Sequence, residues 1–388
     1  MNQHHASALL SQSRLLTHFV RSTHDVKTSS SSLNYVEFQN KVGSSKNLQF
    51  RKRFGEERVL ILTHGFGLGL GYFFDNYDHL LQHFDRIIAV DWLGMGCSAR
   101  TAKEVSRFSI ISNLFSWGSK EKNEEIRIKT SQRVSDELID TLEELRQEKG
   151  INNFVLAGHS LGGYLATEYA LKYPNKIESL VLISPAGISN RPSEDSLVPD
   201  HVINWRVRMI QKLWKLTLTP QTIIRFLGKN WGQDLVRRAV YGRFTRKWSP
   251  LELELLSQYL YHISAAPGNG EFALNAILEP LIYKSSISTR PYQVGIFAIN
   301  PLEMKIRQHL KIPLLMLYGD DDWLRYPSLE HDIQQWKEIH GMNVSLKIIS
   351  NAGHHLYLDN PKEFNETIIH WLQDVEKKKK EKKEMCVL

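Results

Sequence analysis

Three clusters of reactive side chains follow apolar stretches of the chain, in the order that nucleophilic catalysis by serine requires. Ser160 lies in Gly158–Gly162, a pentapeptide of the form G-x-S-x-G, after an apolar stretch at 153–160 and before a predicted helix. This context is typical of a nucleophile elbow, a tight turn that holds the serine at a helix N-terminus, where the dipole favours an oxyanion. A serine hydroxyl also needs a base that an acid orients. The pattern predicts Ser160 as the nucleophile.

The acid and the base are expected after two later apolar stretches, at 312–319 and 343–350, which is the order that follows such a serine. The first stretch ends in three consecutive aspartates. Asp322 is predicted as the acid, because it stands three residues after the glycine that ends the stretch, and Asp321 is the alternative. His354 is predicted as the base, because it follows a glycine directly after the second stretch. Its neighbour His355 is expected to make packing or solvent contacts.

The glycine-rich segment 63–73, THGFGLGLGYF, follows the first core stretch. A His-Gly-hydrophobic-Gly run lets the backbone fold close to a nucleophile. The amides of Phe66 and Leu161 are therefore predicted to form an oxyanion hole. A nucleotide-binding loop is the competing interpretation of these glycines, but they open no convincing helix N-terminus.

The elements that must position these residues follow a regular alternation of strands and helices. Strands are predicted within 58–65, 86–92, 153–160, 178–185, 312–322 and 343–350, with helical patterns between them. The alternation predicts an α/β fold with a mostly parallel central sheet and helices on both faces. The core comprises 51–189 and 301–375, and the Trp-rich segment 190–300 between them is predicted to be a helical, basic cap.

Both ends of the chain are predicted to lie outside this core. The first 24 residues contain no acid, and Leu9, Leu16 and Val20 share one helical face, so residues 1–50 read as a leader and linker. A mitochondrial transit peptide, an amphipathic membrane anchor and a loosely docked leader are all compatible with this composition. Residues 376–388, rich in Lys and Glu, are predicted to be a solvated charged tail.

The positive charge of the chain is concentrated in the predicted cap. Residues 200–248 hold eleven Lys and Arg against two acids, a surplus of nine, so the rest of this +7 chain carries a net −2. Tryptophans among basic residues favour an anionic membrane surface, and a second candidate contact is IISNLFSW at 110–117. No recognised nucleic-acid module accompanies the basic residues. No stretch approaches the roughly eighteen apolar residues of a membrane span. Two distant cysteines indicate a reducing compartment.

These residues resemble the α/β-hydrolase superfamily from about 59 to 372. The resemblance rests on GHSLGGYLATEYALKYP, LVLISPAGI, QYLYHISAAPGNGEFAL, YGDDDWL and AGHHLYLDNP. Within the superfamily, the chain is similar to a lipid-metabolising subfamily. Its members include the lipid-droplet lipase co-activator, a lysophospholipase acting on N-acyl-phosphatidylethanolamine, plant lysophosphatidic acid acyltransferase homologues and fungal cardiolipin-specific deacylases.

The resemblance implies a serine lipid acyl hydrolase of the phospholipase or lysophospholipase type, acting through an acyl-serine intermediate. A lysophosphatidic acid acyltransferase is the alternative, with acyl-CoA as co-substrate. A non-catalytic lipid-surface regulator of a lipase is a third hypothesis, against which the retained Ser160 argues. A soluble small-ester hydrolase is disfavoured by the basic cap. We expect no metal or organic cofactor. We expect a peripheral intracellular protein at an anionic membrane or lipid-droplet surface, in the mitochondrion or the cytosol.

The subfamily's H-x-x-x-x-D element, associated with acyl transfer to lysophosphatidic acid, matches His354 and Asp359. A second interpretation is local. Asn360, Pro361 and Glu363 form a capping-box pattern, and Asp359 just before it suits the positive end of a helix. We favour the helix-start interpretation of Asp359 over a dedicated transferase role, and both remain open at this point.

Overall fold

Among the residues that the structure describes, a central sheet of eight strands carries the predicted site residues at the carboxyl ends of its strands. The strands lie in the order β1-β2-β4-β3-β5-β6-β9-β10; β1 and β2 are antiparallel to their neighbours and the other pairs are parallel. Their bounds are β1 (His24–Asp25), β2 (Tyr35–Gln39), β3 (Val59–Thr63), β4 (Arg86–Val90), β5 (Phe154–His159), β6 (Ile177–Ile183), β9 (Leu314–Gly319) and β10 (Val344–Ile349). The predicted, mostly parallel sheet is confirmed.

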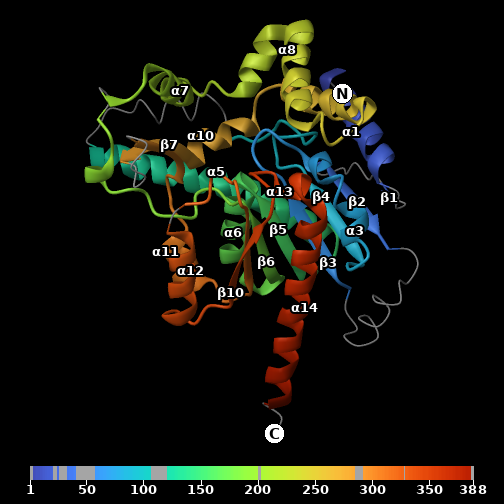
Figure 1. Cartoon of the computed structure of the whole chain (residues 1–388), viewed down its shortest axis with the longest axis vertical. Helices are drawn as coiled ribbons and strands as arrows, with labels where there is room; N and C mark the ends of the chain where they lie inside the picture. The colour runs from blue at the N-terminus through green and yellow to red at the C-terminus, as the bar shows by residue number, and fades with distance from the viewer. Residues whose placement is uncertain are drawn as a thin grey trace.

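The computed structural model in Figure 1 spans the whole chain. The residues it describes are 3–20, 24–25, 33–40, 57–105, 120–199, 202–284, 292–326 and 328–385. The predicted membrane-contact segment 110–117 lies outside them, as does most of the Ser-rich linker. In the described part of the chain, no helix combines the length and the apolar character that crossing a membrane requires.

Helices cover both faces of the sheet because side chains of successive strand residues point to opposite sides. In β3, Ile61 packs on the face that α5 (Lys120–Glu148), α6 (Leu161–Lys172), α11 (Glu303–His309) and α12 (Leu329–Glu338) cover. Leu60 and Leu62 pack on the other face, with α1 (Gln3–Phe19), α3 (Tyr77–Leu80) and α14 (Pro361–Met385). The two hydrophobic cores therefore lie on either side of one sheet.

The cap is inserted between β6 and β9, as predicted, and is mostly helical. Its elements are α7 (Trp205–Lys215), α8 (Pro220–Phe244), α9 (Pro250–Ala265), α10 (Ala273–Ile277), β7 (Leu278–Lys284) and β8 (Tyr292–Ala298). Gly228, with φ 69°, kinks α8. The cap differs from the prediction at its end, where β7 and β8 form an antiparallel hairpin. Leu278 and Ile282, which lie on the same side of β7, are buried there.

The N-terminal region is part of the core, which therefore begins before the predicted boundary at residue 51. Strand β2 pairs with β4, and its Val36 and Phe38 are fully buried. The apolar face of α1 is also buried: Leu16 is inaccessible, and the Phe19 ring lies 4.0 Å from that of Phe74, centroid to centroid. The face that an amphipathic anchor would place in a membrane, one of the three interpretations of this segment, packs against protein in this structure.

The C-terminal helix continues through most of the segment predicted as a separate tail. Helix α14 runs to Met385, and Figure 1 shows its end projecting from the body on the side opposite to α8. Glu376 pairs with Arg58 at 2.7 Å and Lys379 with Glu178 at 3.7 Å. Helical geometry and these ion pairs extend the core past residue 375.

Candidate active site

Ser160 occupies a strained turn between β5 and α6. Its backbone has φ 54° and ψ −119°, a conformation that L-residues adopt only under constraint. Glycines flank it because nothing larger fits. A Cβ on Gly158 would stand 2.4 Å from the carbonyl oxygen of Gly162, and one on Gly162 would stand 2.4 Å from that of His64. The turn has the form of a nucleophile elbow, and Ser160 lines a cavity.

His354 and Asp322 are brought together at the ends of β10 and β9. Nδ1 of His354 lies 3.3 Å from Oδ1 of Asp322. The Asp322 carboxylate also accepts hydrogen bonds from the Ser184 hydroxyl and, at 3.0 Å, from the Leu324 amide. Burial alone would raise the pKa of Asp322, but His354 and these donors outweigh it and hold the pKa below its ordinary value. Asp322 is therefore a carboxylate facing the imidazole.

The other two aspartates of the cluster do different things. Asp320 accepts the amides of Asn351 and Ala352, each at 2.9 Å, and so ties the loop after β10 to the end of β9. Asp321 is exposed and lines the cavity, and in the described part of the chain its carboxylate makes no hydrogen bond to His354. Of the two candidate acids, Asp322 is therefore the one that contacts His354, and Asp321 is not.

The predicted oxyanion loop passes directly over Ser160. A Cβ on Gly65 would lie 2.8 Å from the Ser160 Cβ, so only glycine permits this approach. His64 holds the loop: Nδ1 donates to the Gly65 carbonyl at 2.7 Å, and Nε2 accepts the Trp92 amide at 3.2 Å. Burial lowers the pKa of His64, which keeps the ring neutral. Among the described residues, no acceptor satisfies the amide of Phe66 or of Leu161.

His159, the variable residue before Ser160, was not predicted to contribute. Its Nε2 donates to the carbonyl oxygen of His354 at 2.9 Å, and its Nδ1 lies 3.4 Å from the Tyr357 hydroxyl. Burial, helped by His354 and His355, holds the pKa of His159 well below its ordinary value, so the ring is neutral. A polar residue at a fully buried strand end was the available signal. His159 orients the backbone that carries His354.

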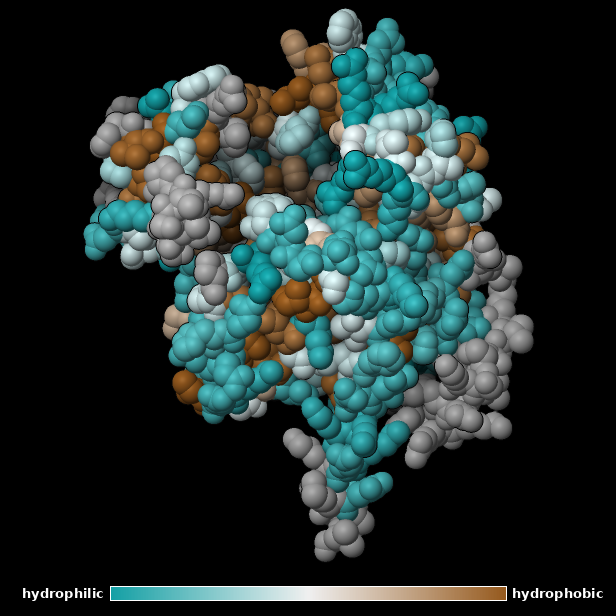
Figure 2. Space-filling model, viewed as in Figure 1, coloured by the Kyte–Doolittle hydropathy of each residue, from teal (hydrophilic) through white to brown (hydrophobic). Residues whose placement is uncertain are grey.

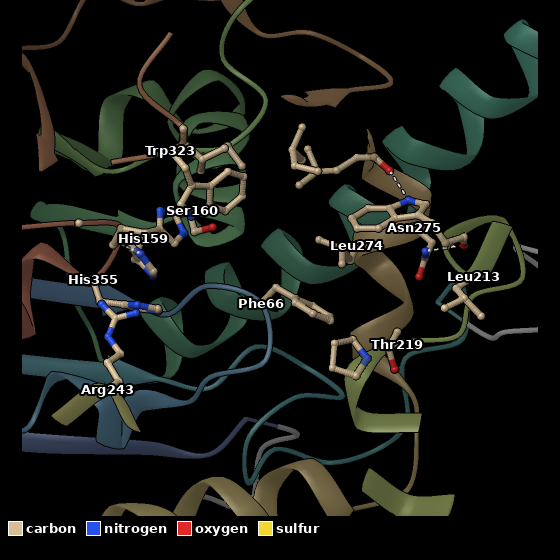
Figure 3. A pocket seen from close by; sticks show the side chains of 18 of the residues that line it. Phe66, His159, Ser160, Leu213, Thr219, Arg243, Leu274, Asn275, Trp323 and His355 are labelled. Carbon is tan, nitrogen blue, oxygen red and sulfur yellow. Dashed lines mark hydrogen bonds between the residues drawn. The ribbon is translucent and has the colours of Figure 1, made fainter. Parts of the chain in front are cut away.

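The cavity extends from this cluster under the cap and has a volume of about 850 Å³. Figure 2 shows it as a hollow with hydrophobic walls between the α7 and α8 regions. In Figure 3, Ser160, His159 and His355 lie at one end, Leu213, Asn275 and Thr219 lie at the other, and Phe66 lies between. The apolar lining is Phe66, Ala186, Leu213, Trp214, Leu218, Pro220, Ile223, Leu274, Leu278, Ile296, Trp323 and Leu324.

Asp359 faces the cavity rather than the helix that follows it. Its Oδ2 accepts the Gly353 amide at 3.0 Å, and both carboxylate oxygens lie 3.2 Å from Nη2 of Arg243 in the cap. Only the N-cap half of the predicted capping box forms at its neighbours, where the Asn360 side chain accepts the Glu363 amide at 3.3 Å. The Glu363 carboxylate accepts the Asn360 side-chain amide at 2.7 Å instead of the Asn360 backbone amide, which donates to the carbonyl of Leu356. The start of α14 is thus built without the Asp359 carboxylate.

Comparison with known proteins places this site in a family. The model of the alpha/beta hydrolase fold family matches residues 58–361. A probable 1-acylglycerol-3-phosphate O-acyltransferase of Oryza sativa subsp. japonica is 31% identical over 362 residues, covering 87% of this chain and 76% of the relative. The human (lyso)-N-acylphosphatidylethanolamine lipase is 28% identical over 310 residues, covering 80% and 77%.

Solved structures share the fold at low identity. The carboxylesterase CesB from Bacillus subtilis has a TM-score of 0.55 and 16% identity, covering 96% of this chain and 99% of its own. The strand order, the elbow at Ser160 and the family match agree. The chain belongs to the α/β-hydrolase family, in the lipid-related branch that includes these plant and human relatives.

Proposed function

We propose that the protein is a serine lipid acyl hydrolase that acts on phospholipid or lysophospholipid esters. The observation that carries the proposal is the position of Ser160 and His354 at one end of a single apolar cavity, with Asp322 hydrogen-bonded behind the imidazole. A volume of about 850 Å³ and a mainly apolar lining suit an acyl chain better than a small polar ester.

In the proposed reaction, Nε2 of His354 takes the proton from Ser160 Oγ while Oγ attacks the ester carbonyl. The Phe66 and Leu161 amides stabilise the resulting oxyanion, and Asp322 stabilises the imidazolium. The tetrahedral intermediate collapses, its C–O bond breaks, and the leaving alcohol takes the proton from His354. Water then repeats the sequence on acyl-Ser160, which releases the fatty acid and restores the serine. These steps need no metal or organic cofactor.

Acyl transfer is the alternative outcome of the same intermediate. The acyl donor would be acyl-CoA, and a lysophosphatidic acid hydroxyl would replace water as the acceptor. The name of the rice relative favours this reaction, as does the presence of the H-x-x-x-x-D element at His354 and Asp359.

We also propose that the cap docks on an anionic lipid surface as a peripheral contact. Large apolar side chains are exposed along α7 and α8: Phe226 at 89%, Trp231 at 75% and Trp205 at 60%. Figure 2 shows hydrophobic surface on the α8 region beside the hollow. Aromatic side chains among Lys and Arg suit the headgroup region of an anionic bilayer, and Ile223, exposed on the same helix, also lines the cavity.

Two assays test the proposal. A fluorophosphonate probe should label the wild-type protein and fail to label Ser160→Ala, and labelling that persists in Ser160→Ala would overturn the nucleophile. Incubation with labelled lysophosphatidic acid, acyl-CoA and phospholipid separates free fatty acid from transferred acyl product. A wild-type protein that neither reacts with the probe nor turns over any lipid would support the non-catalytic regulator instead.

A further inference from the structure

We infer that Arg243 is the phosphate-binding residue of the cavity, and that it selects lysophospholipids over uncharged esters. This assignment rests on the proposed function, since it describes how the same site recognises its substrate. Asp359 acts as the positioning residue that holds Arg243 at the cavity wall.

Arg243 reaches the catalytic end of the cavity from the last turn of α8. Figure 3 shows its guanidinium beside His355, on the side where Ser160 and His159 lie and away from Leu213 and Leu274. It is the only Lys or Arg among the described residues that line the cavity. A phosphate entering this space would meet one fixed positive charge, and that charge is placed next to the reacting groups.

The guanidinium keeps donors available for a ligand. Its contacts with Asp359 involve Nη2 alone, at 3.2 Å from each carboxylate oxygen. In the described part of the chain, no protein acceptor is found for Nε or Nη1. The side chain is 39% exposed, whereas that of Asp359 is 20% exposed. An arginine whose remaining edges are free can bind phosphate with two parallel hydrogen bonds.

Asp359 is anchored to the core independently of Arg243. Its Oδ2 accepts the Gly353 amide at 3.0 Å, and Lys247, one turn beyond Arg243, reaches the carbonyl oxygens of Leu358 and Asp359. The carboxylate therefore stays in place and fixes one edge of the guanidinium. The other edges of the guanidinium remain available to an anion from outside the chain.

The neighbouring His355 ring carries no charge, so Arg243 supplies the positive charge at this end of the cavity. His355 is partly buried, and its Nδ1 is a buried atom with no hydrogen-bond partner among the described residues. Burial, followed by the positive charge of Arg243, holds the pKa of His355 well below its ordinary value, so the ring is neutral. It adds no charge that would compete with the arginine for a phosphate.

This placement matches a lysophospholipid that lies across the site. The single acyl chain would run under the cap toward Leu213 and Leu274, the ester would meet Ser160, and the phosphate would bind Arg243. An uncharged monoacylglycerol offers the first two contacts but not the third. The arginine is thus expected to determine headgroup class rather than reaction chemistry.

The test compares short-chain lysophosphatidic acid with the monoacylglycerol of equal chain length, both below their micellar concentrations so that membrane binding plays no part. Arg243→Gln should lower the ratio of kcat/KM values, phosphorylated over uncharged, by about tenfold to a hundredfold, the usual range for a charged hydrogen bond. Arg243→Lys should recover part of the loss. Arg238→Gln is the matched control, since Arg238 lies on the same helix with 79% of its side chain exposed. It should leave the ratio unchanged.

Calorimetric measurement of the binding of short-chain lysophosphatidic acid to a Ser160→Ala protein supplies a readout that does not depend on turnover. Arg243→Gln in that background should weaken the affinity for short-chain lysophosphatidic acid by a similar factor. The assignment would be overturned if Arg238→Gln weakened the affinity as much as Arg243→Gln does, or if Arg243→Gln left the kcat/KM ratio unchanged. In either case, labelling of Ser160 by the fluorophosphonate probe would still support the proposed function. If Arg243→Gln raised only the KM for acyl-CoA, Arg243 would bind a phosphate of the coenzyme rather than that of the lysophospholipid. This outcome would also overturn the assignment. Absence of labelling would reject the proposed function, and the calorimetry would still decide the role of Arg243.

Discussion

Asp322 and His354 form a hydrogen-bonded pair, Oδ1 to Nδ1 at 3.3 Å, in which the aspartate side chain is wholly buried and the histidine side chain is 12% exposed. The exposed edge of the imidazole belongs to the cavity that Ser160 also lines. Asp322 therefore faces the imidazole, whereas the adjacent Asp321 does not, and this difference leads to the first prediction.

Asp322→Asn should reduce kcat for ester hydrolysis by about 10³- to 10⁴-fold, because an amide in place of the carboxylate favours the wrong imidazole tautomer and cannot stabilise the imidazolium. Asp321→Asn is the matched control and should change kcat less than tenfold. Steady-state hydrolysis of one ester by both variants measures the difference. Equal losses would show that the pair is structural.

Asp359→Asn should lower hydrolysis of an uncharged ester less than tenfold, whereas His354→Ala should lower it at least a thousandfold. The asparagine side-chain oxygen can still accept the Gly353 amide, so the loop carrying His354 keeps its anchor. The kcat for hydrolysis of one uncharged ester, measured for both variants, checks this. A loss in Asp359→Asn as large as that in His354→Ala would place the carboxylate in the chemistry itself.

Membrane binding should depend on the exposed aromatic residues of α8. The double variant Phe226→Ser/Trp231→Ser should bind vesicles containing phosphatidylserine at least about tenfold more weakly, because two large apolar side chains no longer leave water. Ile339→Ser is the control: Ile339 is 69% exposed but lies just after α12, outside the cap. Co-sedimentation at two salt concentrations measures the effect. Unchanged binding of the double variant would reject this surface.

Acid stability should depend on Glu143, which joins α5 to α6. Its carboxylate accepts two hydrogen bonds from Arg146, each at 2.8 Å, and one from the Tyr169 hydroxyl at 2.6 Å. The Arg146 bonds lower the pKa of Glu143 from its ordinary 4.5 to about 2. A lowered pKa means that the native state favours the ionised form, so this contribution is complete above pH 4.5 and is lost between pH 4.5 and 2.

Glu143→Gln should therefore flatten the pH dependence of the free energy of unfolding between pH 5 and 2. At neutral pH it should lower that free energy by about 1–3 kcal/mol. Urea unfolding at several pH values measures both quantities. A variant that loses stability as steeply as the wild type over this interval would contradict the assignment.

The sequence is most informative where function depends on neighbours along the chain. The elbow at Ser160 and the spacing of Asp322 and His354 after their strands are local patterns, and each could be predicted before the fold was known. The N-cap bond from the Glu363 amide to the Asn360 side chain is local in the same sense and forms as expected, whereas the reciprocal bond of the capping box does not form.

What the sequence did not disclose depends on contacts between distant segments. Arg243 and Asp359 are 116 positions apart, and nothing in either neighbourhood indicates that a cap arginine meets the aspartate that ends the short helix 356–359. Strand β2 was missed because five residues that include Glu37 and Gln39 do not read as a buried strand. Glu37 is nevertheless buried, since Arg86 and Lys149 approach it from β4 and from just beyond α5. Its charge is satisfied only by the tertiary fold.

The projecting end of α14 offers an attachment point whose position relative to the cap is defined by the fold. Figure 1 places that end opposite to α8, whereas α1 lies beside the cap helices. A protein tethered through its last helix would present α8 and its exposed apolar side chains away from the tether, and one tethered through its first helix would bring the tether close to the cap. A fluorophore near residue 385 would accordingly report the height of the protein above a lipid surface, with the cap surface that we propose to face lipid left unmodified.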